Sequence, residues 1–204
     1  MKPILAFDVN ETLLDLKALD PIFEHIFGDS TVRQQWFSQF IQNAFVSIIT
    51  DDYQSFGKIG IAALEMVAMR KRIALKEEDK LTIINGMKNL PAYPEVPHAL
   101  KMLKSAGFRM VTLTNSTEEV GRTQIKNAGL NEYFENILSA DSVKTLKPAK
   151  QAYIFAAKSL NTEAKNLILI AAHTWDIVGA MKVGCYAAFI ARPGAVLDPL
   201  ALQP

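Results

Sequence analysis

Residues 3–14 have the sequence PILAFDVNETLL, an apolar run that ends at one acid, Asp8, and is followed by polar residues. A short uncharged run of this kind predicts a buried strand. In open α/β sheets the active site lies at the carboxyl ends of the strands, which is where this pattern puts Asp8. An aspartate in that place can also be only a turn or cap residue. The partners that the rest of the chain supplies decide between these interpretations.

The composition fits a globular protein of one domain, or of a core with an insertion. The 204 residues are 50% hydrophobic, and 22 Lys and Arg balance 21 Asp and Glu to a formal net charge of +1. Without a long basic run, the charges do not indicate a nucleic-acid partner. No apolar run reaches the roughly 18 residues that a membrane span needs, so we expect a cytoplasmic protein with no membrane partner. The single Cys185 lies in an apolar stretch and is expected to be a structural thiol.

Two patterns follow the first strand. Residues 15–90 show only helical periodicity, with helices expected at about 18–27, 31–48, 55–70 and 76–87. Beyond three prolines, strands at 109–114, 136–140, 166–171 and 186–190 alternate with helices at 96–106, 118–128, 150–160 and 176–183. This alternation predicts an α/β fold, a Rossmann-like parallel sheet with helices on both faces. We assign 1–14 and 91–204 to a core domain.

Residues 15–90 are assigned to an all-helical cap domain inserted after strand one. A helical block that enters directly beside Asp8 can close over this edge of the sheet and exclude water. The alternative is that these helices only extend the core.

Polar residues follow the other strands as well. Because the carboxyl ends of parallel strands meet at one edge, these residues can converge on one pocket. Taken singly, each has a structural explanation, such as a helix cap, a surface lysine, a loop histidine or a core tryptophan. Together, and in this chain order, they are hard to obtain by chance. The residues are Asp8, Asn10 and Thr12 after the first strand, Thr114 and Asn115 after the second, Lys147 after the third, and His173, Trp175 and Asp176 after the fourth.

These groups resemble the four motifs of the haloacid dehalogenase-like hydrolase superfamily. The motifs here are DVNET at 8–12, LTNS at 113–116, KP at 147–148, and AAHTWD at 171–176 followed by Gly179 and Ala180. The resemblance covers nearly the whole chain, and the helical block stands where that superfamily carries its cap. It implies that Asp8 is a nucleophile, which divides one difficult step into two easier ones.

Within the superfamily, two positions favour dehalogenation over phosphate transfer. Phosphatases of this family usually carry a second aspartate two residues after the nucleophile as acid and base, and here that residue is Asn10. They also hold magnesium through an aspartate of the fourth motif, where this chain has Ala172. A halide leaves without a proton, so a carbon–halogen bond needs neither group. The chain therefore resembles the type II 2-haloacid dehalogenases, which also have the tyrosine six residues after the lysine, here Tyr153.

This resemblance implies a metal-independent and cofactor-independent reaction on small 2-haloacids, either haloacetates or (S)-2-haloacids. Asp8 would displace halide with inversion, and water would hydrolyse the resulting aspartyl ester to give a 2-hydroxy acid. The resemblance also implies roles for further residues: Thr12 and Lys147 hold Asp8; Asp176, with His173, activates water; Asn10, Thr114 and Asn115 bind the substrate carboxylate; Phe37, Phe56 and Trp175 form an apolar pocket; and Tyr153 supports Lys147 beside the substrate.

Two departures from that branch concern the halide and the water. The dehalogenases have an arginine in the second cap helix to receive the halide, but Trp36 is followed here by Phe37. Arg33 lies one turn earlier, and we expect it not to replace that arginine. The serine and asparagine of the fourth motif are Ala171 and His173 here, so His173 is a candidate for positioning halide or water.

Two other functions stay open on the sequence alone. One is a phosphatase acting on a small metabolite, and the other is a non-catalytic protein that binds a carboxylate in the cap cleft. The apolar cap helices are also compatible with a homodimer.

Overall fold

A five-stranded parallel sheet forms the centre of the computed structural model, which describes residues 2–204. The strand order is β3-β2-β1-β4-β5, so β1 lies in the middle, between β2 and β4. Each predicted strand is present, with ends that differ by a residue or so. The bounds are β1 Ile4–Phe7, β2 Met110–Thr114, β3 Asn136–Ser139, β4 Leu167–Ala171 and β5 Tyr186–Phe189.

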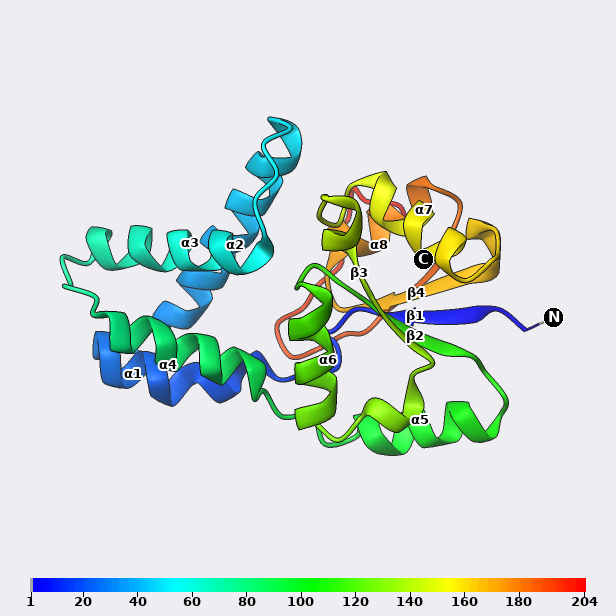
Figure 1. The fold of residues 1–204 in the computed structure, drawn as a ribbon, viewed down its shortest axis with the longest axis horizontal. Helices are drawn as coiled ribbons and strands as arrows, with labels where there is room; N and C mark the ends of the chain where they lie inside the picture. The colour runs from blue at the N-terminus through cyan, green and yellow to red at the C-terminus, as the bar shows by residue number, and fades with distance from the viewer. Residues whose placement is uncertain (1) are drawn as a thin grey trace.

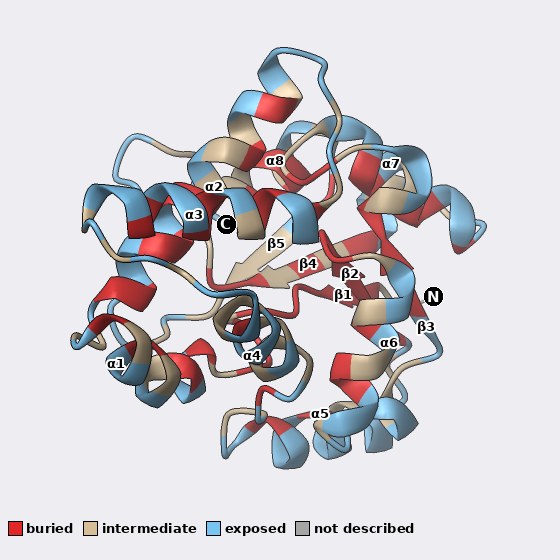
Figure 2. Ribbon diagram, turned by 60° about the vertical axis from the view of Figure 1, so that its left-hand side comes forward, coloured by how far each residue is buried: buried red, intermediate tan, exposed pale blue. Residues whose placement is uncertain are grey.

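Helices cover both faces of the sheet, as the alternating pattern predicted. α5 (Val96–Ser105) and α6 (Glu118–Asn127) lie on one face, and α7 (Lys150–Ser159) and α8 (Thr174–Lys182) lie on the other (Figure 1). The side chains of β1 alternate between the two cores that result: Leu5 and Phe7 pack in one, Ile4 and Ala6 in the other. The central strands are consequently buried on both faces (Figure 2).

The helices between β1 and α5 stand beyond the carboxyl ends of the strands (Figure 1). We call residues 15–90 the helical insertion. It contains η1 (Leu16–Leu19, a 3₁₀ helix), α1 (Asp20–Phe27), α2 (Val32–Ile49), α3 (Phe56–Arg70) and α4 (Glu77–Lys88). Short 3₁₀ turns in the rest of the chain are η2 (Asn131–Tyr133), η3 (Ala140–Val143) and η4 (Ala164–Asn166).

Two expected helices begin at other residues in the structure. The helix expected at 18–27 divides into η1 and α1, because Pro21 occupies the first turn of α1, where its fixed backbone angle favours a helix start. The helix expected from residue 176 begins at Thr174, so Trp175 and Asp176 belong to the first turn of α8.

The insertion connects to the sheet through two linkers that run side by side. The Asp15 N–H donates to the Pro91 carbonyl at 2.8 Å, and the Tyr93 N–H donates to the Leu13 carbonyl at 3.0 Å. Within the insertion, α2 and α3 cross closely, and Trp36 Nε1 donates to the Gly60 carbonyl at 2.8 Å. Over residues 2–204, no helix combines the length and apolar character needed to cross a membrane.

Candidate active site

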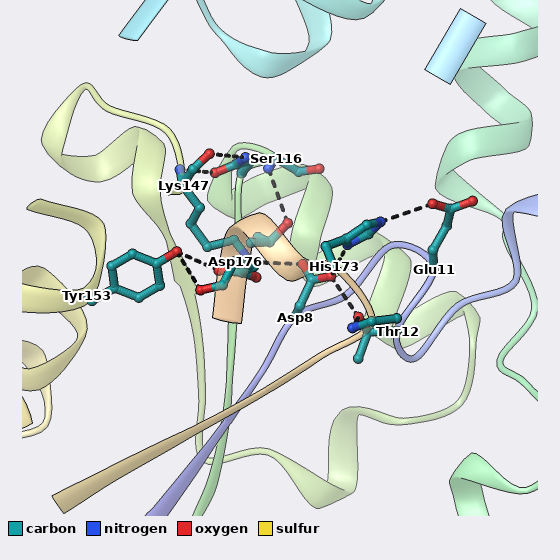
Figure 3. A network of polar contacts seen from close by, with 11 residues as sticks. Asp8, Glu11, Thr12, Ser116, Lys147, Tyr153, His173 and Asp176 are labelled. Carbon is teal, nitrogen blue, oxygen red and sulfur yellow. Dashed lines mark hydrogen bonds and ion pairs between the residues drawn. The ribbon is translucent and has the colours of Figure 1, made fainter. Parts of the chain in front are cut away.

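Asp8 lies directly after β1 and is only 5% exposed. Its backbone N–H donates to the Ile170 carbonyl at 3.0 Å, which continues the pairing of β1 with β4. Its Oδ1 accepts a hydrogen bond from Lys147 Nζ at 2.8 Å, and its Oδ2 accepts one from Thr12 Oγ1 at 2.7 Å (Figure 3). These are the two partners that the sequence led us to expect. The Thr12 hydroxyl in turn accepts from the Ala172 N–H at 3.0 Å, which joins the first and fourth motifs.

Lys147 is fully buried between two carboxylates. Its Nζ lies 2.8 Å from Asp8 Oδ1 and 2.6 Å from Asp176 Oδ2. Burial alone would lower the pKa of Lys147, but the charges of Asp176 and Asp8 outweigh it and raise that pKa. The lysine therefore stays charged. The backbone of Lys147 is held by the Asn115 side chain, whose Oδ1 accepts from Lys147 N–H at 2.6 Å and whose Nδ2 donates to the Lys147 carbonyl at 3.3 Å.

Asp176 supports Lys147 and has no free carboxylate oxygen. Its Oδ2 accepts from Lys147, and its Oδ1 accepts from the Tyr153 hydroxyl at 2.6 Å. The side chain has no solvent exposure. Burial raises the pKa of Asp176, an effect that Lys147 opposes and the negative charge of Asp8 reinforces. α8 can approach Tyr153 because residue 179 is glycine: a Cβ there would lie 2.6 Å from the tyrosine oxygen.

His173 covers the other side of Asp8. Its Nδ1 lies 3.3 Å from Asp8 Oδ2, and its Nε2 lies 3.0 Å from Glu11 Oε2 (Figure 3). Burial would lower the pKa of His173, but the hydrogen bonds to Asp8 and Glu11 outweigh it and raise the pKa to about 9. The imidazole is therefore protonated at neutral pH.

The pKa of Asp8 is the net result of opposing effects. Burial would raise it, but the positive charge of Lys147 and the hydrogen bond from His173 hold it well below its ordinary value. Asp8 is therefore an ionised, almost fully buried carboxylate. Such a group can act as a nucleophile because little water competes for it.

Aromatic side chains from the insertion pack against the same cluster. The Trp175 ring stacks on His173 at a centroid distance of 5.0 Å. From α2, Phe37 lies 6.1 Å from His173, and Phe45 lies 5.8 Å from Trp175. Phe56, at the start of α3, packs on Phe40 at 4.1 Å. Of the three aromatics expected to form a substrate pocket, Phe37 and Trp175 lie against His173, and Phe56 lines a separate apolar cavity.

Two cavities flank the cluster, and Asp8 lines neither of them. An apolar cavity of about 150 Å³ lies between α2, α3, α4 and α6, and Phe56, Ser116 and Gln124 are among its lining residues. A polar cavity of about 390 Å³ is lined by Glu11, Lys17, Arg33, Tyr93, His173, Trp175 and Arg192, among others. Since His173 contacts Asp8 and also lines the polar cavity, this imidazole separates the carboxylate from that cavity.

Four side chains that we expected to bind substrate form hydrogen bonds within the protein. The Asn10 Oδ1 accepts from Gln124 Nε2 at 3.0 Å, and the Thr114 Oγ1 accepts from the Ser116 N–H at 3.1 Å. Both polar atoms of Asn115 bind the Lys147 backbone, and the Tyr153 hydroxyl is donated to Asp176. These side chains shape the loops and orient Lys147.

Sequence reasoning missed Glu11, Gln124 and Arg192. Glu11 contacts His173, and Arg33 Nη1 lies 3.8 Å from Glu11 Oε1 while Arg33 Nε donates to Asp20. That Arg33 does not take the place of the halide-binding arginine stays a prediction. Arg192 donates to the Thr12 carbonyl at 2.7 Å. For Glu11 the only signal in the sequence was its place inside the first motif. For Gln124 and Arg192 the sequence held no signal.

The donor set does not suit a magnesium ion of the phosphatase type. Position 172 is an alanine, and both Asp176 oxygens bind Lys147 and Tyr153. Between residues 2 and 204, no group of three or more His, Cys, Asp or Glu side chains is arranged to hold a metal.

Comparisons with known proteins show the family of this chain. A family model described as haloacid dehalogenase-like hydrolase matches residues 5–190. The chain is 25% identical over 202 residues to (S)-2-haloacid dehalogenase 2 of Pseudomonas sp. (strain CBS-3), covering 98% of this chain and 88% of the relative. It is 24% identical to haloacetate dehalogenase H-2 of Moraxella sp. (strain B), covering 98% and 90%.

A solved structure has the same fold. It is L-2-haloacid dehalogenase from Xanthobacter autotrophicus with chloropropionic acid covalently bound. Its TM-score to this chain is 0.92, with 18% identity, and the match covers 100% of this chain and 93% of that one.

Proposed function

The chain belongs to the haloacid dehalogenase-like hydrolases, and from this premise we propose that it hydrolyses small 2-haloacids to 2-hydroxy acids and halide. The substrates are haloacetates or (S)-2-haloacids, the classes named for its relatives. The observation that carries the proposal is an ionised, buried Asp8 bound by Lys147 and Thr12, with an amide, Asn10, where a phosphatase has its acid.

In the first step one carboxylate oxygen of Asp8 attacks the halogen-bearing carbon from the side opposite the halogen. A carbon–oxygen bond forms as the carbon–halogen bond breaks, the configuration inverts, and halide departs with the bonding electron pair. Lys147 and Thr12 orient the carboxylate for this attack. No proton is needed, which agrees with the amide at position 10.

In the second step water attacks Cγ of Asp8. The bond between Cγ and the ester oxygen breaks, the 2-hydroxy acid leaves, and Asp8 returns with one oxygen from water. Because water attacks Cγ and not the substrate carbon, the oxygen atom from water enters the Asp8 carboxylate. The oxygen that leaves with the product comes from Asp8. His173 is the group best placed to act on this water, because both oxygens of Asp176 are engaged.

We also propose that residues 15–90 act as a cap over a core of residues 1–14 and 91–204. The contacts of Phe37 with His173 and of Phe45 with Trp175 support a cap that closes over the nucleophile. A closed cap excludes water during the first step, when a solvated carboxylate would be a weaker nucleophile. The backbone N–H groups that follow Asp8, rather than the engaged side chains of Thr114 and Asn115, are the proposed donors to the substrate carboxylate.

A halide-release screen without added metal tests the function. We expect chloride or bromide release from haloacetates and from one enantiomer of 2-chloropropionate, unchanged by EDTA and abolished in Asp8→Asn. In ¹⁸O-labelled water, Asp8 should gain label after many turnovers. If no haloacid releases halide, and magnesium instead supports turnover of a generic phosphate ester, the chain is a phosphatase. If a haloacid stabilises the protein without turnover, it is a binding protein.

A further inference from the structure

We propose that Glu11 and His173 form a general-base pair that is held inactive by the free Asp8 carboxylate and is released when Asp8 becomes an ester. The inference rests on the proposed function and deepens it, because it names the group that activates water in the second step. It assigns a role to Glu11, which lies within the first motif but for which the family resemblance implied no role.

The geometry of the pair is that of a base with an orienting carboxylate. His173 spans the gap between two acids, with Nδ1 3.3 Å from Asp8 Oδ2 and Nε2 3.0 Å from Glu11 Oε2. Trp175 stacks on one face of the imidazole, and Phe37 packs beside it, so the ring cannot turn freely. Glu11 therefore holds a proton on Nε2 and leaves Nδ1 facing the atoms that react.

The backbone of Glu11 supplies an independent observation. Its φ is +59°, in the left-handed region that favours glycine and that a glutamate adopts only at a cost. The loop is closed there by the Glu11 N–H, which donates to the Leu14 carbonyl at 2.9 Å. A glycine would fit this turn without strain. Strain of this kind, at a side chain that contacts the site, points to a function for the carboxylate.

The charges around His173 explain why the base is inactive at first. Asp8 and Glu11 contact the imidazole, and Arg33 approaches Glu11. Lys17 and Arg192 line the polar cavity that His173 also lines. Lys147 and Asp176 lie on the far side of Asp8. With both acids ionised, Nδ1 carries a proton, in agreement with the pKa of about 9. A protonated imidazole cannot accept a proton from water.

Formation of the ester removes the charge of Asp8 and leaves Lys147 charged. One of the two contacts that keep His173 protonated is then lost, so Nδ1 releases its proton to solvent. Water binds at Nδ1, gives it one proton and attacks Cγ of Asp8. That proton passes from Nδ1 to the departing alkoxide. The second proton of the water stays on the Asp8 carboxyl and then moves to Nδ1, which restores the starting ion pair. One proton is released per turnover, as the overall reaction requires.

Rapid-quench kinetics with 2-chloropropionate test this assignment in the whole protein. In Glu11→Gln we expect first-turnover halide release within about threefold of the parent, and ester hydrolysis slowed by about tenfold to a hundredfold. The ester should accumulate on the peptide that contains Asp8, which mass spectrometry detects. The pH profile of hydrolysis should move to lower pH, because the charge that supports protonation of His173 is gone. Glu118→Gln, which removes an exposed carboxylate of α6, is the matched control and should leave both steps unchanged.

A second variant separates chemistry from folding. Glu11→Gly removes the same carboxylate but suits the φ of +59°, so we expect the turn to keep its conformation and the ester to accumulate as in Glu11→Gln. If both variants release halide, hydrolyse the ester at the rate of the parent and keep its pH profile, the inference is wrong and the proposed function stays intact. Equal slowing of both steps also overturns the inference. If the parent releases no halide from any haloacid, the proposed function fails first.

Discussion

Asp8 combines two properties that usually oppose each other, deep burial and a stable negative charge. Burial strips water from the carboxylate, while Lys147, Thr12 and His173 replace that water with three directed hydrogen bonds. A carboxylate so held is oriented and ionised, but it is also stabilised, which costs nucleophilicity. Burial compensates in the reaction proposed above, because there the substrate carbon would meet an anion with little hydration.

At the residue scale, Lys147→Met should be strongly destabilising. Removing the ammonium leaves Asp8 and Asp176 buried side by side without a cation, and loss of one partner of a buried ion pair costs about 3–5 kcal/mol. Urea unfolding at pH 7 measures this loss in the free energy of unfolding. The loss should shrink at acidic pH, as the stranded carboxylates take up protons. Lys158→Met, at an exposed position of α7, is the control, and an equal effect there would contradict the prediction.

The raised pKa of His173 predicts a stability change on the alkaline side. Because this pKa is about 9 in the folded protein and about 6.5 in an unfolded chain, the stabilisation is complete below about pH 6.5 and is lost as the pH rises through 9. The difference corresponds to at most about 3 kcal/mol. Chemical unfolding between pH 6 and 10 measures it. In His173→Asn this alkaline decline should disappear, and a decline that persists unchanged would assign it to another group.

At the element scale, the contact between α2 and α3 depends on one glycine. A Cβ at Gly60 would lie 2.8 Å from the Phe40 ring, at the point where Trp36 also hydrogen-bonds the Gly60 carbonyl. Gly60→Ala must therefore push the helices apart, at a cost of about 1–3 kcal/mol. Because Phe40 and Gly60 both line the apolar cavity, its shape must change as well.

The same helix supplies the control for this prediction. A Cβ at Gly57 meets nothing within 4 Å, so Gly57→Ala should stabilise α3 by about 0.5–1 kcal/mol through helix propensity alone. Thermal unfolding compares the two variants, which we expect to shift Tm in opposite directions. If Gly60→Ala is neutral, the α2–α3 contact is looser than the structure indicates.

At the scale of the whole molecule, the insertion and the sheet are joined at several points besides the linkers. The Tyr53 hydroxyl, between α2 and α3, donates to the Asp141 carboxylate in η3. Burial and the neighbouring acid raise the pKa of Tyr53 well above its usual range, so the hydroxyl keeps its proton. Together with the contacts of Phe37 and Phe45, this bond joins the insertion to the part of the chain that contains the sheet.

Tyr53→Phe should therefore loosen the insertion without unfolding it. Loss of one hydrogen bond costs about 1 kcal/mol, and amide hydrogen exchange should become faster around residues 50–54 and 140–144. Exchange followed by mass spectrometry measures this. Tyr186→Phe, at an exposed position of β5, should leave these segments unchanged. Identical exchange in Tyr53→Phe and the parent would show that the hydroxyl does not tie the two parts together.

The sequence predicted most of this architecture because its signals are local. The apolar strands and the helical periodicity depend on near neighbours, and parallel pairing brings Asp8, Lys147 and His173 to one edge once the strands are known. The directions of the side chains did not follow from the sequence. Asn115 turns toward the Lys147 backbone, and Tyr153 toward Asp176, because of loop and packing geometry that no periodicity encodes. The pairing of Glu11 with His173 depends on the positive φ of Glu11. From sequence alone, a positive φ is expected at glycine and not at glutamate.

The central position of β1 has a consequence for how the chain is made. β1 is synthesised first, yet its neighbours in the sheet are far along the chain: Leu5 pairs with Met110, and Ile4 with Leu167. Until β4 leaves the ribosome, the apolar first strand has one edge without its hydrogen-bonding partner, a condition that invites aggregation. Pairings between such distant residues also make folding slow. Asp8 is therefore made early and gains Lys147 and His173 only late, so a partly made chain carries this carboxylate without the two groups that keep it ionised.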